Sequence, residues 1–237
     1  MKITTRPIKA CLVALLVTGA AISAKAVTYS VDPGATWLGF MNVFNTPQNG
    51  GGYQFGGSWG LPELNSSWGG PVLSLSPNTI SDPNSFWYTP SGGPGSVGNK
   101  IMDASFYQEF NGPLAGQSVT FTGTVLANSL LSNVNQQGNG WTSVAFIKDF
   151  APDFSSFNVV TAPLNVSGVF SINMATINNP ARHVQFGFET IGPDVWATDA
   201  PAFGNVQINA VPEPTTAVLL IGGIICLGLR SRNQIRL

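Results

Sequence analysis

Apolar and polar residues alternate with a period of two through the middle of the chain, and this pattern constrains the fold more than any other feature. Within residues 118–127, Val119, Phe121 and Val125 share one side of an extended chain, while three threonines occupy the other. Successive side chains of a β-strand point to opposite faces of its sheet, whereas a helix repeats every 3.6 residues. No window within residues 27–209 keeps the helical period. The pattern therefore predicts strands that bury one face.

Similar short segments recur along the chain, and clusters of Gly, Pro, Asn and Ser separate them. The other candidate strands cover residues 28–31, 38–44, 86–89, 105–110, 141–148, 169–174, 183–191 and 205–209. Many short strands joined by turn-rich loops are typical of sandwiches and barrels. We expect one all-β domain, an antiparallel β-sandwich with a jelly-roll-like arrangement of about eight to ten strands.

The first 26 residues have the organisation of a secretory signal peptide. Three basic residues precede an apolar run over residues 11–21, and Ala24 and Ala26 supply the small residues of a cleavage site. We expect cleavage after Ala26, which leaves residues 27–209 as the exported domain.

Residues 210–237 contain three parts in a fixed order. Pro212, Glu213 and Pro214 come first, an apolar segment over residues 215–229 follows, and the end is basic, with Arg230, Arg232 and Arg236. The apolar segment is suited to enter a bilayer while the arginines stay on the cytoplasmic side. A helix of this length spans roughly 22 Å, less than the ~30 Å of a hydrocarbon core. We therefore expect a short transmembrane helix that holds the chain at the membrane transiently.

This ending resembles the PEP-CTERM sorting domain, on the strength of Pro212, Glu213 and Pro214, the apolar segment and the arginines. The resemblance covers residues 211–237 and implies exosortase, a membrane transpeptidase, as a partner. It also implies removal of the tail and transfer of the protein to the cell surface or extracellular matrix of a Gram-negative bacterium.

The predicted domain is acidic although the whole chain is nearly neutral. Residues 27–209 hold three Lys and Arg against ten Asp and Glu, a net charge of −7. Such a domain repels phosphate backbones, which excludes nucleic acid as a partner. Both cysteines, Cys11 and Cys226, fall outside it, so the domain has neither disulfides nor thiol chemistry.

Aromatic residues are the feature of the domain that points most directly to a ligand. Tyr53, Trp59, Trp68 and Trp87 lie in or near segments rich in Gly, Asn and Ser. Exposed aromatic rings in such loops can pack against the C–H faces of sugars, and we take these four residues as candidate polysaccharide contacts. The alternative is that they fill the core, because Trp is highly buried on average.

Two glycine motifs match catalytic or cofactor signatures without the required context. Ser58 is the central residue of a G-x-S-x-G match, which functions at a strand-to-helix turn. Residues 93–98 match G-x-G-x-x-G, which needs a βαβ unit. No helical pattern follows either motif, so we assign no catalytic residue and no nucleotide site.

The remaining chemistry of the domain rests on carboxylates and one histidine. His183 is expected to be solvated on an outward strand face, and a lone histidine does not make a multi-histidine metal site. We expect no cofactor, except that a structural calcium ion stays open, with Asp149, Asp153, Asp194 and Asp199 as its oxygen ligands. A glycoside-cleaving pair also stays open. It would need a cleft with two facing carboxylates, at least one with a raised pKa.

The final strands resemble the end of carbohydrate-binding jelly rolls, in which a strand, a loop and a short closing strand complete the sandwich. Residues 183–191, 192–203 and 204–208 follow this order, although Gly204 stands where such modules often carry a calcium-binding Asp. We therefore expect an exported, exosortase-processed surface or matrix protein whose non-catalytic sandwich is a binding or structural module, with polysaccharide as its candidate ligand. A self-associating structural protein and a secreted glycoside-active enzyme are the alternatives.

Overall fold

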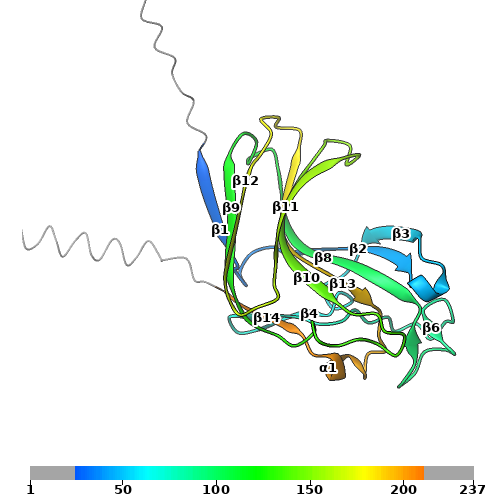
Figure 1. Cartoon of the computed structure of the whole chain (residues 1–237). Helices are drawn as coiled ribbons and strands as arrows, with labels where there is room; N and C mark the ends of the chain where they lie inside the picture. Colours follow the sequence, from blue (N-terminus) through cyan, green and yellow to red (C-terminus); the bar gives the residue numbers. More distant parts are fainter. Residues whose placement is uncertain (1–24, 211–237) are drawn as a thin grey trace, which may run out of the picture.

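Two six-stranded sheets form the framework of the part of the chain that the computed structural model describes, residues 25–210 (Figure 1). In what we call the β8 sheet, the strand order is β11 (Phe157–Pro163), β10 (Thr142–Phe150), β13 (His183–Pro193), β8 (Lys100–Asn111), β2 (Leu38–Asn45) and β3 (Tyr53–Ser58).

The second sheet, which we call the β9 sheet, is formed by shorter strands around β9. Its order is β1 (Ala26–Ser30), β9 (Ser118–Asn128), β14 (Val206–Asn209), β5 (Val72–Leu75) and β4 (Ser66–Gly69), and β12 (Gly168–Ala175) also pairs with β9. The remaining secondary structure of the described residues is a small ribbon and two short helices. The ribbon pairs β6 (Tyr88–Thr89) with β7 (Val97–Gly98), and the helices are η1 (Pro47–Asn49) and α1 (Ala200–Phe203). In this part of the chain, neither helix has the length and apolar character needed to cross a membrane.

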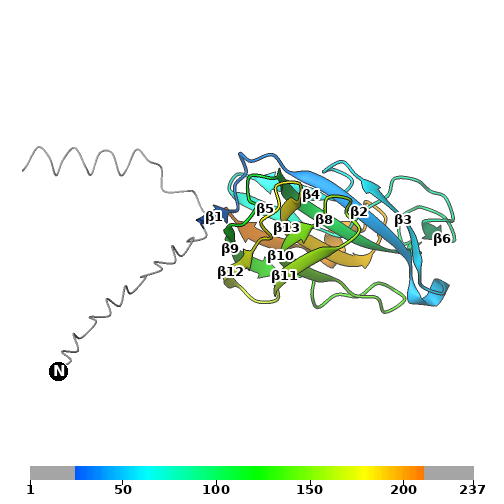
Figure 2. The ribbon, with the colours of Figure 1, turned by 90° about the horizontal axis from the view of Figure 1, so that it is seen from above.

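The all-β prediction is confirmed, with one departure in strand direction. The strand pairs of both sheets are antiparallel except β1 with β9, which run parallel from Ala26 opposite Ser118 to Ser30 opposite Thr122. The N-terminal strand therefore extends the β9 sheet before the chain crosses to β2 in the other sheet (Figure 2).

The predicted signal peptide and sorting segment fall almost entirely outside the described residues. Ala26 is described, and it both begins β1 and is the last residue before the expected cleavage point. The other positions named for these segments lie outside residues 25–210: Ala24, Pro212, Glu213, Pro214, Arg230, Arg232 and Arg236.

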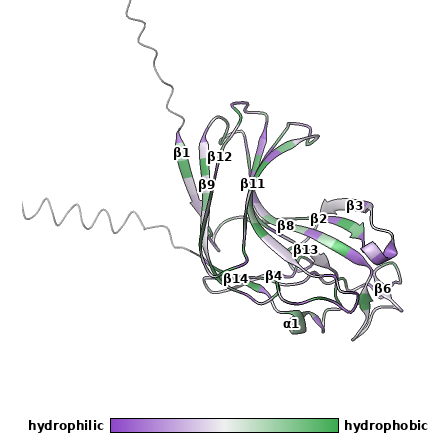
Figure 3. Ribbon diagram, in the orientation of Figure 1, coloured by the Kyte–Doolittle hydropathy of each residue, from purple (hydrophilic) through white to green (hydrophobic). Residues whose placement is uncertain are grey.

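The core lies between the two sheets and is built from the residues that the alternation marked as apolar. Phe121 on β9 contacts Phe186 and Phe188 on β13, with ring centroids 5.2 and 5.4 Å apart. The alternating apolar residues of β9, β12, β13 and β14 are all buried: Val119, Phe121, Val125, Phe170, Ile172, Met174, Val184, Phe186, Phe188, Val206 and Ile208. Figure 3 shows how hydrophobic and hydrophilic residues alternate along the strands. Burial of these faces supplies the main driving force for folding.

Several strands are longer than predicted or were not predicted. β8 has 12 residues, from Lys100 to Asn111, where the pattern marked only 105–110. Strands β3, β4, β5 and β11 had no predicted counterpart. β3 contains Gly56 and Gly57, which lower its strand propensity, and its hydrogen bonds to β2 compensate.

Candidate functional site

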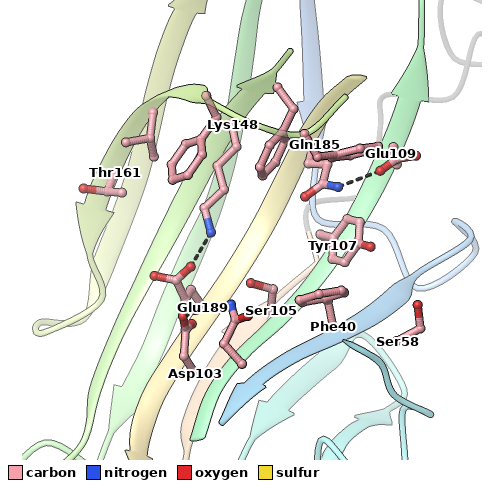
Figure 4. A pocket seen from close by; sticks show the side chains of 15 residues that line it. Phe40, Ser58, Asp103, Ser105, Tyr107, Glu109, Lys148, Thr161, Gln185 and Glu189 are labelled. Carbon is pink, nitrogen blue, oxygen red and sulfur yellow. Dashed lines mark hydrogen bonds and ion pairs between the residues drawn. The ribbon is translucent and has the colours of Figure 1, made fainter. Parts of the chain in front are cut away.

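A cleft of about 720 Å³ lies on the face of the β8 sheet that points away from the core. Successive side chains of strand β8 point to opposite faces of its sheet. Met102, Ala104 and Phe106 are buried in the core, while the residues between them line the cleft. Figure 4 shows the cleft from close by. Its lining residues are Phe40, Asn42, Ser58, Asp103, Ser105, Tyr107, Glu109, Lys148, Phe150, Phe154, Phe157, Val159, Thr161, Gln185 and Glu189.

Four charged side chains face this cleft, three acidic and one basic. The Lys148 ammonium on β10 forms an ion pair with the Glu189 carboxylate on β13. The Gln185 amide donates a hydrogen bond of 2.6 Å to the Glu109 carboxylate on β8. Figure 4 shows both interactions as dashed lines. Glu189 thus has an ionic partner, whereas Glu109 has a neutral one.

Asp103 is the most perturbed carboxyl group of the cleft. Its Oδ2 atom accepts a 3.4 Å hydrogen bond from the Asn42 amide, and its Oδ1 atom is buried without a hydrogen-bond partner in the described structure. Burial, followed by the negative charge of Glu189, raises the pKa of Asp103 to about 6. In the strand register Glu189 lies opposite Ser105, which makes Asp103 its diagonal neighbour on the same face (Figure 4).

Aromatic rings supply the apolar part of the cleft. Phe154 and Phe157 are each 49 % exposed, and Phe157 packs against Phe150 with ring centroids 4.9 Å apart. Phe154 has a φ of 57°, in the left-handed region that non-glycine residues rarely adopt. Its ring stacks on His183 at 4.2 Å. Exposed rings beside polar groups form a surface on which an amphipathic ligand can pack.

The four aromatic residues chosen from the sequence do not line the cleft. Trp87 is buried, and Trp59 and Trp68 are partly buried against the core. These three tryptophans therefore agree with the alternative expectation, that the aromatic residues fill the core. Tyr53 is 59 % exposed and packs edge-on against Phe44.

The motifs considered in the sequence have structural settings that differ from their signatures. Ser58 ends strand β3 and lines the cleft, and a turn rather than a helix follows it. Residues 93–96 form a loop, and the last two residues of the motif, 97 and 98, form β7. His183 is partly exposed on β13, where its Nδ1 atom lies 2.6 Å from Asn111 Oδ1 and its ring stacks on Phe154.

The four aspartates considered as calcium ligands do not form one site. Asp149 is fully buried in an ion pair with Arg182, at 2.7 Å. Asp153 caps a turn at Ser155, and Asp199 accepts a hydrogen bond from the Gly95 amide. Within residues 25–210, no three His, Cys, Asp or Glu side chains come together as a metal site requires.

Asp194 is buried next to the start of β8 and binds its backbone. Its Oδ1 atom accepts a 2.9 Å hydrogen bond from the Lys100 amide, and its Oδ2 atom is buried without a partner in the described structure. Burial raises the pKa of Asp194 to about 7. A Cβ atom at Gly98 would lie 1.9 Å from the Asp194 carbonyl oxygen, so only glycine fits beside it.

This raised pKa predicts that the protein loses stability as the pH rises from about 4 to about 7. The folded state holds the Asp194 proton more tightly than the unfolded state, whose carboxyl pKa is near 3.8, so ionisation costs folding free energy. We expect Asp194→Asn to reduce the stability difference between pH 5 and pH 8 by about 2–3 kcal/mol. Urea unfolding of both proteins at the two pH values measures this. An unchanged difference would contradict the account.

Sequence reasoning does not find the cleft residues, because their pattern is that of ordinary solvent exposure. Asp103, Ser105, Tyr107 and Glu109 alternate with core residues, a pattern that any half-buried strand gives. The concentration of charge and aromatic character on one face of β8, β10 and β13 was the available clue.

Comparison of the chain with protein-family models, with curated proteins and with solved structures finds no match.

Proposed function

We propose that this chain is an exported surface or matrix protein whose jelly-roll-like sandwich is a non-catalytic module that binds polysaccharide in the cleft of the β8 sheet. The single observation that carries the proposal is this cleft of about 720 Å³, with its exposed phenylalanines and its row of polar side chains. Sugar rings have apolar C–H faces and polar hydroxyl edges. They therefore match a surface that presents aromatic rings beside amides and carboxylates.

The cleft and the C-terminal end of the described domain lie on different sheets, an arrangement that suits a protein held by its C-terminus. The described chain leaves the domain from β14 in the β9 sheet, whereas the cleft lies on the outer face of the β8 sheet. Delivery itself is proposed from the sequence: export by a signal peptide cleaved after Ala26, a short transmembrane helix over residues 215–229, and processing by exosortase at Pro212, Glu213 and Pro214.

Affinity electrophoresis against a panel of polysaccharides, including those of the host, tests the proposed function. Each gel is run with and without a chelator, and released sugars are assayed in parallel. Retardation without sugar release is the expected result, and its loss with chelator would reveal a calcium requirement. Neither retardation nor release, from a protein shown to be folded, would support the structural, self-associating alternative instead.

Glycoside cleavage is a second candidate function, and one observation favours it. Asp103, with its raised pKa, is the diagonal neighbour of Glu189 across β8 and β13. Diagonal residues lie about 7–8 Å apart at the backbone, and the carboxyl groups of glycosidases are about 5–9.5 Å apart. Asp103 would protonate the leaving oxygen while the Glu189 carboxylate, paired with Lys148, acts as nucleophile or base.

The two candidates differ in one measurable result. Cleavage predicts new reducing ends from a bound polysaccharide, abolished by Asp103→Asn and retained by Asp82→Asn, which alters an exposed carboxylate outside the cleft. The non-catalytic module predicts that neither the native protein nor either variant releases sugar.

A further inference from the structure

The carboxylates of the cleft are only partly balanced by positive charge. Asp103, Glu109 and Glu189 face it together with one ammonium group, that of Lys148, which is already paired with Glu189. Among the described residues, neither Asp103 nor Glu109 forms an ion pair. An anionic ligand would therefore meet uncompensated negative charge in a recessed site, where water screens it less than at an open surface.

The two cleft carboxylates without an ionic partner also accept few hydrogen bonds. Glu109 receives one hydrogen bond from the Gln185 amide, and Asp103 receives one long bond of 3.4 Å from Asn42. Asp103 Oδ1 is buried and has no donor in the described structure. A carboxylate with so few donors is poorly stabilised in a recess, so a ligand that brings donors to the partly exposed side chains of Asp103 and Glu109 compensates for part of the missing hydrogen bonding.

We propose that the cleft selects glycans that present hydroxyl or ammonium donors to Asp103 and Glu109, and rejects glycans that carry carboxylate or sulfate groups. The substrate class is thus neutral or amino-sugar polysaccharide rather than uronate or sulfated polysaccharide. This inference rests on the proposed function, because it assigns a chemical class to the ligand of the same cleft. The acidic balance of residues 27–209, three basic against ten acidic residues, acts in the same direction over a longer range.

Three hexasaccharides of β-1,4-linked pyranoses serve as probes. Cellohexaose is neutral, the glucosamine hexamer carries ammonium groups, and the mannuronate hexamer carries carboxylates. The mannuronate units differ from the other two at C2 as well as in charge, and charge-neutral variants of the cleft separate these effects. Calorimetric titration of the full chain, purified as its host exports it, at pH 7 and low salt should give at least tenfold weaker binding of the mannuronate hexamer than of the better of the other two. A preference for the glucosamine hexamer over cellohexaose identifies ammonium as the donor, and equal binding identifies hydroxyl groups.

Charge-neutral variants test whether the cleft itself makes this distinction. We expect Asp103→Asn combined with Glu109→Gln to reduce the discrimination against the mannuronate hexamer by about tenfold. The matched control combines Asp32→Asn with Asp82→Asn, two exposed carboxylates outside the cleft that accept turn hydrogen bonds, a role asparagine can keep. The control changes net charge equally and should leave the discrimination intact.

Three results would overturn the inference, and they distinguish its failure from that of the proposed function. Equal or tighter binding of the mannuronate hexamer, or equal effects of the cleft and control variants, would overturn charge selection while the binding function stands. Absence of binding to all three hexamers and to the polysaccharide panel would overturn the proposed function and this inference with it.

Discussion

Replacement of Pro212, Glu213 and Pro214 by alanine is expected to abolish removal of the C-terminal tail. The tripeptide is the feature that the resemblance to PEP-CTERM domains assigns to exosortase recognition, and the apolar segment after it is suited to hold an uncut chain at the membrane. The variant should therefore stay in the membrane fraction with its tail attached. Mass spectrometry of the mature protein measures the difference directly.

A second substitution separates recognition from anchoring. Replacement of Arg230, Arg232 and Arg236 by alanine leaves the tripeptide intact but removes the charges that orient the segment. We expect it to alter retention at the membrane before processing. The outcome that would contradict processing by exosortase concerns the first variant. If the chain without Pro212, Glu213 and Pro214 shows the release and the mature mass of the native protein, exosortase does not process it.

Arg182→Ala is expected to lower the free energy of unfolding by about 3–5 kcal/mol, the cost of leaving a buried charge without its partner. The Asp149 side chain is fully buried. Its Oδ1 atom accepts a 2.7 Å bond from the Arg182 guanidinium, and its Oδ2 atom accepts a 2.8 Å bond from the Ile177 amide. Without Arg182, only the amide would remain to stabilise the carboxylate. Chemical denaturation followed by tryptophan fluorescence measures the change.

The double variant Asp149→Asn, Arg182→Met is the control for this prediction. It removes both charges, and the side-chain oxygen of the new asparagine would remain able to accept a hydrogen bond, so most of the lost stability should return. If the double variant is as unstable as the single variant, the loss comes from packing of the Arg182 side chain rather than from an unpaired charge.

The parts of the fold that follow from local pattern were predictable, and those that depend on sheet assembly were not. Alternation identified the buried faces of β9, β12 and β13, because one face of each packs on the core. Strand β3 escaped prediction because Gly56 and Gly57 give no apolar pattern. Its place in the sheet comes from pairing with β2, a contact between segments that local propensity does not describe.

The candidate site depends even more on tertiary structure. Asp103 on β8 and Glu189 on β13 are 86 positions apart in the sequence, and only the register of the two strands makes them neighbours. The tryptophans illustrate the opposite error. Their abundance is a matter of composition, but whether Trp87 faces solvent or core depends on how its loop folds over the sheet, and it is buried.

The most direct test of the central claim, that the cleft of the β8 sheet binds polysaccharide, compares two aromatic substitutions. Phe154→Ala combined with Phe157→Ala removes the exposed rings of the cleft. Phe55→Ala removes a ring that is 39 % exposed on β3 and shares the core-side face with Val43. Titration with the polysaccharide that the native protein binds most tightly should show at least tenfold weaker binding for the cleft variant, about 1.4 kcal/mol, and unchanged binding for Phe55→Ala. Native affinity in the cleft variant, with its fold intact, would contradict the account.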